Sequence, residues 1–134
     1  MSEIVSSGGC ACGAVRFTAR GKPLRSGLCH CRTCQRAQGS AYFPFVVFAP
    51  DQVAFTGSVA SWKSTPAYDR RYCPACGSRF ASINPDAVEL ATTSFDETGL
   101  FPPQYESWTI RRQPWIKPLD VPQYDRDRPD DTAS

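Results

Sequence analysis

Several segments of the chain alternate apolar and polar residues with the period of two that is typical of half-buried β-strands. The clearest are residues 14–19 and 88–92. Shorter or less regular segments that also predict strands lie at residues 24–28, 53–55, 59–63, 68–72, 79–83 and 105–110. Turn-forming residues such as Pro50-Asp51 and Asn84-Pro85 stand between them. The pattern predicts a mainly β protein of short strands joined by turns.

Two segments depart from this alternation. Residues 41–49 form a nearly continuous run of aromatic and β-branched residues, which predicts a central buried strand. Pro44 interrupts the run and predicts a β-bulge or a break in register. Residues 32–38 lack proline and contain only one β-branched residue, so they predict a short helix that ends at Gly39.

The composition favours one domain with many turns. The chain has 134 residues, of which 12 are proline and 9 are glycine. We expect a single domain over residues 1–124. Residues 125–134 carry six charges and almost nothing to bury, so they predict a disordered C-terminal tail.

The charge balance excludes some classes of partner. Fifteen basic and 13 acidic residues give a net charge of +2, which is too small to indicate a nucleic-acid surface. The clusters Arg70-Arg71 and Arg111-Arg112 are short, and we expect them at solvated strand edges. The alternative for these clusters is contact with an anionic small molecule. No apolar run approaches the roughly 20 residues that span a bilayer, and residues 1–7 lack the pattern of a signal peptide. We therefore expect a cytoplasmic protein with no membrane partner.

The seven cysteines are the strongest chemical signal in the chain. Their odd number and close spacing fit metal binding in a reducing compartment better than disulfides. Cys10 with Cys12, and Cys73 with Cys76, stand beside glycines that permit the sharp turn of a zinc knuckle. Two such knuckles commonly close one tetrahedral four-thiolate zinc site, which would stabilise a small β domain. The alternative, four free buried thiols, fits this spacing poorly.

Cys29, Cys31 and Cys34 form a second cluster around the only histidine, His30. In an extended segment, Cys29 and Cys31 point to one face and His30 to the other. The favoured interpretation is a three-thiolate zinc with one position open to water or substrate. His30 would then make a hydrogen bond behind the ligands or pack in the core. The alternative is a second structural site that His30 completes.

The order of motifs resembles the glutathione-dependent formaldehyde-activating enzyme family, which includes centromere protein V. The resemblance runs from about residue 8 to residue 124. It rests on these motifs in order: Gly-Gly-Cys-x-Cys-Gly-x-Val, Cys-His-Cys-x-x-Cys-Gln-x-x-x-Gly, Cys-x-x-Cys-Gly, Ser-x-Asp and Arg-x-Pro-Trp. It implies a β-tent fold of twisted antiparallel sheets with zinc-ribbon knuckles. It also implies two zinc ions per chain: a structural one at Cys10, Cys12, Cys73 and Cys76, and a catalytic one at Cys29, Cys31 and Cys34.

The resemblance further implies an activity, the formation of S-hydroxymethylglutathione from formaldehyde and glutathione, which is classed as a carbon–sulfur lyase reaction in reverse. The expected partner is then a small-molecule thiol, with glutathione as the candidate. A zinc ion with three thiolate ligands carries net negative charge, which favours holding the substrate sulfur over generating a strong hydroxide. A site with one protein ligand fewer also binds metal less tightly, so the three-cysteine site is the one expected to lose its ion.

Substrate contacts are predicted at His30 and at Arg32. Glutathione has two carboxylates, for which Arg32 or Arg36 on the short helix is a candidate, and solvent exposure is the alternative for both arginines. Ser94 and Asp96 match the family's Ser-x-Asp turn, although Thr93 replaces its glycine and the turn has a purely structural interpretation too. One position departs from the family. Many members carry a histidine two residues before an aromatic residue in the late part of the chain, where this sequence has Glu106.

Two other classes of function remain open at this point. The first is a non-catalytic zinc-binding module that presents a surface to a protein or a nucleic acid, although the weak net charge disfavours nucleic acid. The second is a redox or metal-handling protein whose three-cysteine cluster loses zinc and oxidises. The sequence does not fix the oligomeric state, and an oligomer is compatible with it.

Overall fold

The computed structural model describes residues 4–129, and these residues form two β-sheets, one α-helix and three 3₁₀ turns. The smaller sheet has the order β1-β2-β5 and contains β1 (Val5–Gly9), β2 (Arg16–Arg20) and β5 (Val53–Thr56). The larger sheet has the order β10-β3-β4-β9-β8-β7-β6. Its strands are β3 (Arg25–Cys29), β4 (Phe43–Phe48), β6 (Ala60–Thr65), β7 (Tyr68–Tyr72), β8 (Arg79–Asn84), β9 (Ala87–Ala91) and β10 (Glu106–Ser107). The mainly β prediction is confirmed.

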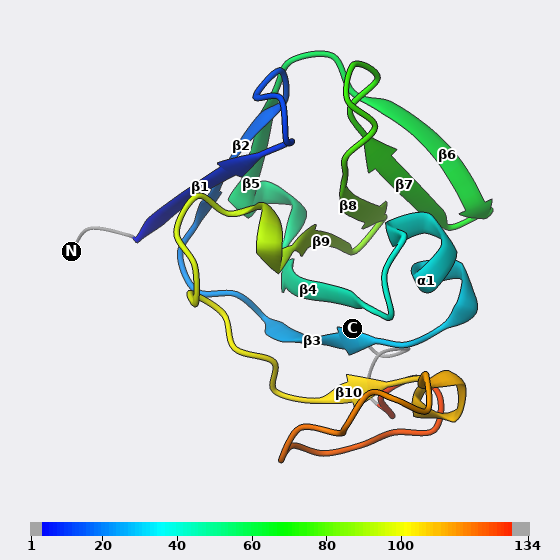
Figure 1. Ribbon diagram of the computed structural model, residues 1–134. Coiled ribbons are helices and arrows are strands. Elements are labelled where there is room, and N and C mark those ends of the chain that lie inside the picture. The colour runs from blue at the N-terminus through cyan, green and yellow to red at the C-terminus, as the bar shows by residue number, and fades with distance from the viewer. Residues whose placement is uncertain (1–3, 130–134) are drawn as a thin grey trace.

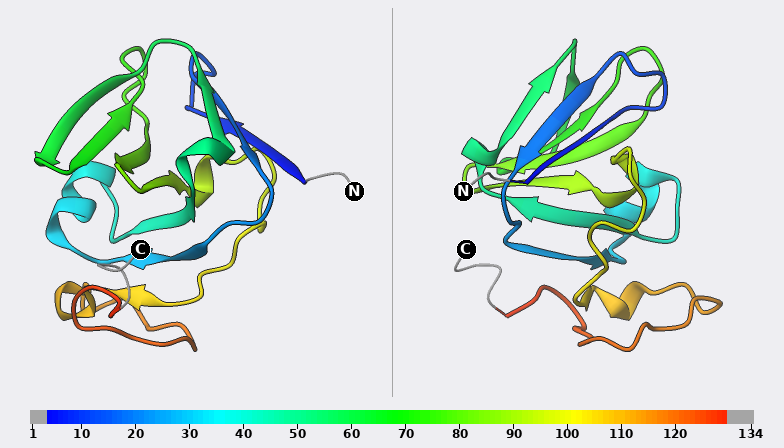
Figure 2. Two further views of the ribbon diagram at one scale, coloured as in Figure 1. Left: turned by 180° about the vertical axis from the view of Figure 1, so that it is seen from behind. Right: turned by 90° about the vertical axis from the view of Figure 1, so that its left-hand side faces the viewer.

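The two sheets lean toward each other like the sides of a tent (Figure 1). β2 and β5 rise on one side, β6, β7 and β8 rise on the other, and the loops between β1 and β2 and between β7 and β8 lie near the top. β3, β4 and β10 run across the base, and the two further views show the same arrangement (Figure 2). The pairings between named strands are antiparallel except that of β10 with β3, which is parallel.

β4 is an interior strand of the larger sheet, between β3 and β9, and it is buried on both faces, as its continuous apolar run predicted. Val46 and Phe48 belong to the apolar cluster between the two sheets. Phe45 and Val47 belong to a second cluster, which also contains Cys34 and Tyr105 and lies on the opposite face. β4 therefore separates the two halves of the core.

The bulge predicted at Pro44 is wrong, because β4 pairs with β3 in unbroken register from Phe43 to Val47. Pro44 pairs with Leu28, whose N–H donates to Tyr105 on the far side of β3. Pro44 thus occupies a position of the β3–β4 ladder that needs no N–H. Pairing with β9 starts only at Phe45, so the missing donor is not needed on that side either.

The short helix is confirmed as α1 (Arg32–Gln38). Gly39 ends it with φ 63°, the left-handed conformation that glycine adopts at little cost. Cys31 is the N-cap, and its Sγ accepts a hydrogen bond from the N–H of Cys34 at 3.2 Å. One cysteine of the second cluster therefore caps the helix that carries another.

β1 was not predicted, because its sequence Val-Ser-Ser-Gly-Gly has no apolar alternation. It pairs with β2 from Val5 opposite Arg20 to Gly9 opposite Arg16. Gly8 permits the close packing of this strand on the rest of the domain. A Cβ at this position would lie 2.3 Å from the Ser94 carbonyl oxygen and 2.6 Å from the Phe17 ring.

The last predicted strand, residues 105–110, is correct only at β10. The chain leaves the sheet at Trp108, whose φ of 56° is the only positive value at a non-glycine residue in the described part of the chain. It continues into the 3₁₀ turn η3 (Thr109–Arg111). Two further 3₁₀ turns, η1 (Pro50–Gln52) and η2 (Thr92–Ser94), connect strands.

The predicted disordered tail falls partly within the described residues. Residues 125–129 fold back onto the domain, where the carbonyl of Arg126 accepts from the Trp108 N–H at 3.0 Å. The carboxylate of Asp127 accepts from the Trp108 indole N–H at 2.9 Å. Residues 130–134 lie outside the described residues.

Candidate functional site: two cysteine clusters and a cavity

The loops between β1 and β2 and between β7 and β8, which lie near the top in Figure 1, bring four cysteines together. The Sγ atoms of Cys10 and Cys12 lie 3.6 Å apart, and those of Cys12 and Cys73 lie 3.8 Å apart. Cys76 supplies the fourth sulfur, and all four Sγ atoms lie within 4.8 Å of one another. Tetrahedral zinc with Zn–S bonds of about 2.3 Å places its sulfurs about 3.8 Å apart. The donor set therefore fits one zinc ion.

The backbone around this cluster is arranged for thiolates. The N–H of Val15 donates to Cys10 Sγ at 3.2 Å. Ser78 links the two knuckles, because its hydroxyl accepts from the N–H of Ala11 at 3.0 Å and lies 3.2 Å from Cys76 Sγ. Hydrogen bonding at Ser78 lowers the pKa of Cys76 to about 5, which favours the deprotonated form that a metal requires.

The second cluster lies where β3 meets α1. Cys29 is the last residue of β3, Cys31 caps α1, and Cys34 lies in its first turn. Their Sγ atoms lie within 4.8 Å of one another. The expected alternation is present, since Cys29 and Cys31 converge while the intervening His30 is fully buried. Three thiols at this separation fit a zinc ion that needs one further ligand.

A buried arginine stands beside this second cluster. Arg70 of β7 is only 7% exposed, so the prediction of a solvated strand edge is wrong at this residue. Its Nη1 lies 3.8 Å from Cys34 Sγ, and its Nε donates to Ser64 at 2.8 Å. Contacts with the Cys29 and Cys34 thiols and the charge of Arg70 lower the pKa of Cys31. Contacts with Cys31 and burial raise the pKa values of Cys29 and Cys34. Without a metal ion, the negative charge of the cluster is therefore centred on Cys31.

The three cysteines line a cavity with a volume of about 420 Å³. The cavity brings together residues from β3, β4, β7, β9, β10 and the C-terminal segment. Besides the cysteines, its wall includes the cations Arg25 and Arg70, the acids Glu89 and Asp127, and the aromatic residues Tyr68, Tyr105 and Trp108. The four-cysteine cluster does not line this cavity. The two clusters therefore differ in environment as well as in number of ligands.

The residues predicted to contact substrate do not line this cavity. The guanidinium of Arg32 bonds to Gln35 and faces a separate surface depression beside α1. Asp96 forms an exposed ion pair with Arg16, and its N–H donates to Ser7 at 2.9 Å. Ser94, in η2, lies against β1 of the smaller sheet.

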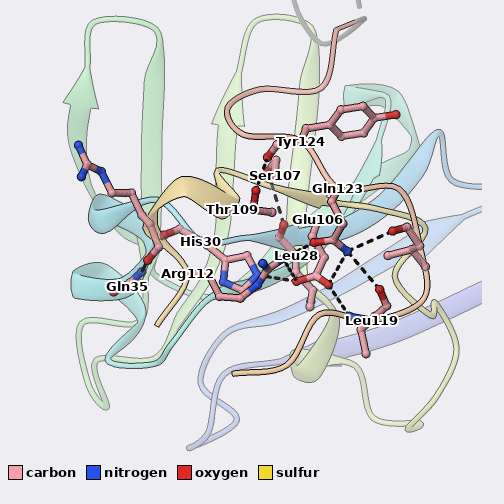
Figure 3. Close-up of polar contacts among 12 residues, drawn as sticks. Leu28, His30, Gln35, Glu106, Ser107, Thr109, Arg112, Leu119, Gln123 and Tyr124 are labelled. Atoms are coloured by element: carbon pink, nitrogen blue, oxygen red, sulfur yellow. Dashed lines mark hydrogen bonds and ion pairs between the residues drawn. The ribbon is translucent and has the colours of Figure 1, made fainter. Parts of the chain in front are cut away.

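His30 is fully buried and does not line the cavity. Its ring contacts Glu106 (Figure 3). His30 Nε2 and Glu106 Oε1 are 2.6 Å apart. The Glu106 carboxylate also accepts from the Leu119 N–H at 2.7 Å and from Gln123 Nε2 at 2.9 Å. Arg112 Nη2 lies 3.5 Å from it. Glu106 therefore joins the cysteine-bearing segment to the C-terminal segment and faces away from the cavity.

Most of the cavity wall was not predicted from the sequence. Tyr68, Glu89 and Trp108 were not singled out as site residues, and Arg70 was named only as part of one of two arginine pairs that could meet an anionic small molecule. One signal was present: Glu89 is the only charged residue of β9, whose other four residues are Ala, Val, Leu and Ala. A lone carboxylate in an interior strand of a sheet is costly unless it faces a polar site.

These features define a mainly β protein with two cysteine clusters, each of which could hold a metal ion. The chain matches the model of the glutathione-dependent formaldehyde-activating enzyme family over residues 5–111. It belongs to this family. A comparison of the sequence with curated proteins found no match. Among the described residues, no helix has the length and apolar character needed to cross a membrane.

Proposed function

We propose that this protein is a zinc-dependent enzyme of the carbon–sulfur lyase type that acts on the adduct of a small-molecule thiol and an aldehyde, such as S-hydroxymethylglutathione. The observation that carries the proposal is the position of Cys29, Cys31 and Cys34 together in the wall of a cavity of about 420 Å³. Family membership supports the same class of reaction.

The two clusters take different parts in this proposal. The set of four cysteines satisfies a tetrahedral ion by itself, so it would hold a structural zinc. The set of three would hold a second zinc and leave one position to the substrate. Zinc bound there would keep a substrate sulfur deprotonated at neutral pH.

The chain's own residues would bind and enclose the substrate. Arg25 and Arg70 supply positive charge in the cavity, which suits a thiol that carries carboxylates, as glutathione does. They are better placed for this than Arg32, which lies outside the cavity. Tyr105 and Trp108 supply aromatic walls that exclude water from a reactive adduct.

Glu106 leaves this proposal unchanged. A histidine at this position in other family members does not imply a substrate contact here, because the carboxylate of Glu106 is fully buried and hydrogen-bonded to Leu119, Gln123 and His30. Its neighbour Ser107 faces the cavity instead. We also propose a cytoplasmic location, because cysteines grouped as two sets of metal ligands fit a reducing compartment.

Exchange spectroscopy by NMR tests the proposal. Formaldehyde and glutathione are mixed, and the rate of exchange with their adduct is measured with wild-type protein and with Cys31→Ser. We expect the wild type to accelerate exchange and Cys31→Ser to lose that acceleration while keeping its fold. A folded wild type that holds zinc at both clusters and leaves exchange unchanged would contradict the proposal and favour a non-catalytic zinc-binding module.

A further inference from the structure

A carboxylate and a phenol lie together in the cavity wall. The hydroxyl of Tyr68 donates to Glu89 Oε2 at 2.6 Å. Tyr68 begins β7 and Glu89 is central in β9, so this hydrogen bond passes over β8, which lies between the two strands. Both residues line the cavity that contains Cys29, Cys31 and Cys34. Neither is a zinc ligand in the proposed function.

The surroundings of this pair favour proton uptake by Glu89. Burial raises the pKa of Glu89 despite opposing contributions from the Tyr68 hydroxyl and from three cations. Those cations are Arg79 of the adjacent strand β8, and Arg25 of β3 and Arg70 of β7, each of which is separated from β9 by one strand. Burial also raises the pKa of Tyr68, and the negative charge of Glu89 raises it further. The phenol therefore keeps its proton at neutral pH.

We propose that Glu89 and Tyr68 are the proton-transfer pair of the thiol–aldehyde reaction. This inference rests on the proposed function and adds the groups that move the proton. The aldehyde oxygen must gain a proton as the thiol loses one, and the proposed zinc ligands supply no group that carries it between them. Positioned acids and bases accelerate such steps by about 10²- to 10⁴-fold.

The step balances without any further reactant. In the direction of synthesis, the thiol gives its proton to the Glu89 carboxylate and the sulfur forms a bond to the aldehyde carbon. The π electrons of the carbonyl move to its oxygen, which takes the proton of the Tyr68 hydroxyl. Glu89 then returns a proton to Tyr68, and both residues regain their starting state. Cleavage of the adduct follows the same path in reverse.

A structural role for the pair makes a different prediction. If the hydrogen bond only tied β7 to β9, Glu89→Gln would be nearly silent, because the amide oxygen still accepts from the Tyr68 hydroxyl. An amide cannot take up the thiol's proton. Glu89→Gln therefore separates the two roles, and Tyr68→Phe provides a second variant that removes a single oxygen.

The experiment measures the exchange rate of formaldehyde, glutathione and adduct by NMR between pH 5 and pH 9, together with the zinc content of each protein. We expect Glu89→Gln and Tyr68→Phe each to lower the rate by about 100-fold at neutral pH. Glu89→Gln should also flatten the pH profile. The double variant should be no slower than either single one, because the two residues act as one unit. Zinc content should stay at the wild-type value.

Glu97→Gln is the matched control, because Glu97 is exposed and lies outside the cavity. It should leave rate and pH profile unchanged. A second readout needs no turnover: infrared difference spectra on adding glutathione alone should show a new protonated-carboxyl band in the wild type and none in Glu89→Gln.

The possible failures are distinguishable. If wild type accelerates exchange and Glu89→Gln matches it in rate and pH profile, this inference is wrong and the proposed function stands. If wild type gives no acceleration at any pH, the proposed function fails and the inference fails with it. A glutathione-induced carboxyl band that persists in Glu89→Gln would also overturn the assignment to Glu89.

Discussion

The guanidinium of Arg70 lies 3.8 Å from the sulfur of Cys34, although 36 residues separate them in sequence. The contact puts a buried cation against the three-cysteine cluster on the cavity side. A cation in that position offsets the negative charge of three thiolates and attracts an anionic substrate.

Replacement of this cation should weaken the binding of anionic thiols. A hydrogen bond to a charged group contributes about 1.5–3 kcal/mol. Arg70→Gln should therefore raise the KM for glutathione by roughly 10- to 100-fold. The neutral thiol 2-mercaptoethanol should be affected much less, and steady-state kinetics with both thiols measures the difference.

Arg71→Gln is the control for this prediction. Arg71 is the neighbouring residue, but it is paired with Asp69 at 3.1 Å and does not line the cavity. It should leave both KM values near those of the wild type. Equal effects of Arg70→Gln on the two thiols would contradict an electrostatic role for Arg70.

Glu106 should be a stability residue. Its carboxylate is fully buried and satisfies donors from His30, Leu119 and Gln123. Breaking a buried charged network of this kind costs about 3–5 kcal/mol. Glu106→Ala should lower the free energy of unfolding by that amount, as measured by urea denaturation at pH 7. The exposed Glu97→Ala should change it by less than about 0.5 kcal/mol.

The same residue predicts a pH dependence of stability. Burial alone would raise the pKa of Glu106, but hydrogen bonds from Gln123, Leu119 and His30 outweigh it and lower the pKa. The native state therefore gains stability from this carboxylate above the unfolded glutamate pKa of about 4.3, and loses it as pH falls through the folded value. The difference in unfolding free energy between wild type and Glu106→Ala should shrink below about pH 4. A difference that stayed constant down to pH 3 would argue against this role.

Trp108 should reveal a backbone requirement. Its φ of 56° places it in the left-handed region. A residue with a Cβ adopts that conformation at a conformational free-energy cost of about 1–2 kcal/mol. Trp108→Gly and Trp108→Ala both remove the ring from the cavity wall, so their comparison isolates the backbone. We expect the glycine variant to be more stable than the alanine variant by about 1 kcal/mol in thermal unfolding. An alanine variant as stable as the glycine variant would show that the turn relaxes.

The sequence predicted those features that are encoded locally. Cysteine spacing identified both clusters, and Gly39 marked the end of α1, because caps and knuckles depend on a few adjacent residues. The apolar run of β4 predicted a buried strand, because burial on both faces leaves no polar positions.

The cavity wall was not predictable in this way. Tyr68 and Glu89 meet across β8, and Arg70 meets Cys34 through the order of the strands in the sheet, which periodicity does not specify. β1 was missed because its strand is set by pairing with β2 and not by apolar side chains. The β-bulge predicted at Pro44 is absent, because the effect of a proline depends on which side of the strand its nitrogen faces.

Zinc stoichiometry tests whether the seven cysteines divide into a closed set of four and an open set of three. Metal content and circular dichroism are measured on freshly purified wild type, Cys31→Ser and Cys73→Ser. This division predicts two zinc ions in the wild type, one in a folded Cys31→Ser, and an unfolded Cys73→Ser, because structural zinc contributes on the order of 10 kcal/mol to folding. A Cys31→Ser variant that unfolds as completely as Cys73→Ser, or a Cys73→Ser variant that stays folded, would contradict it.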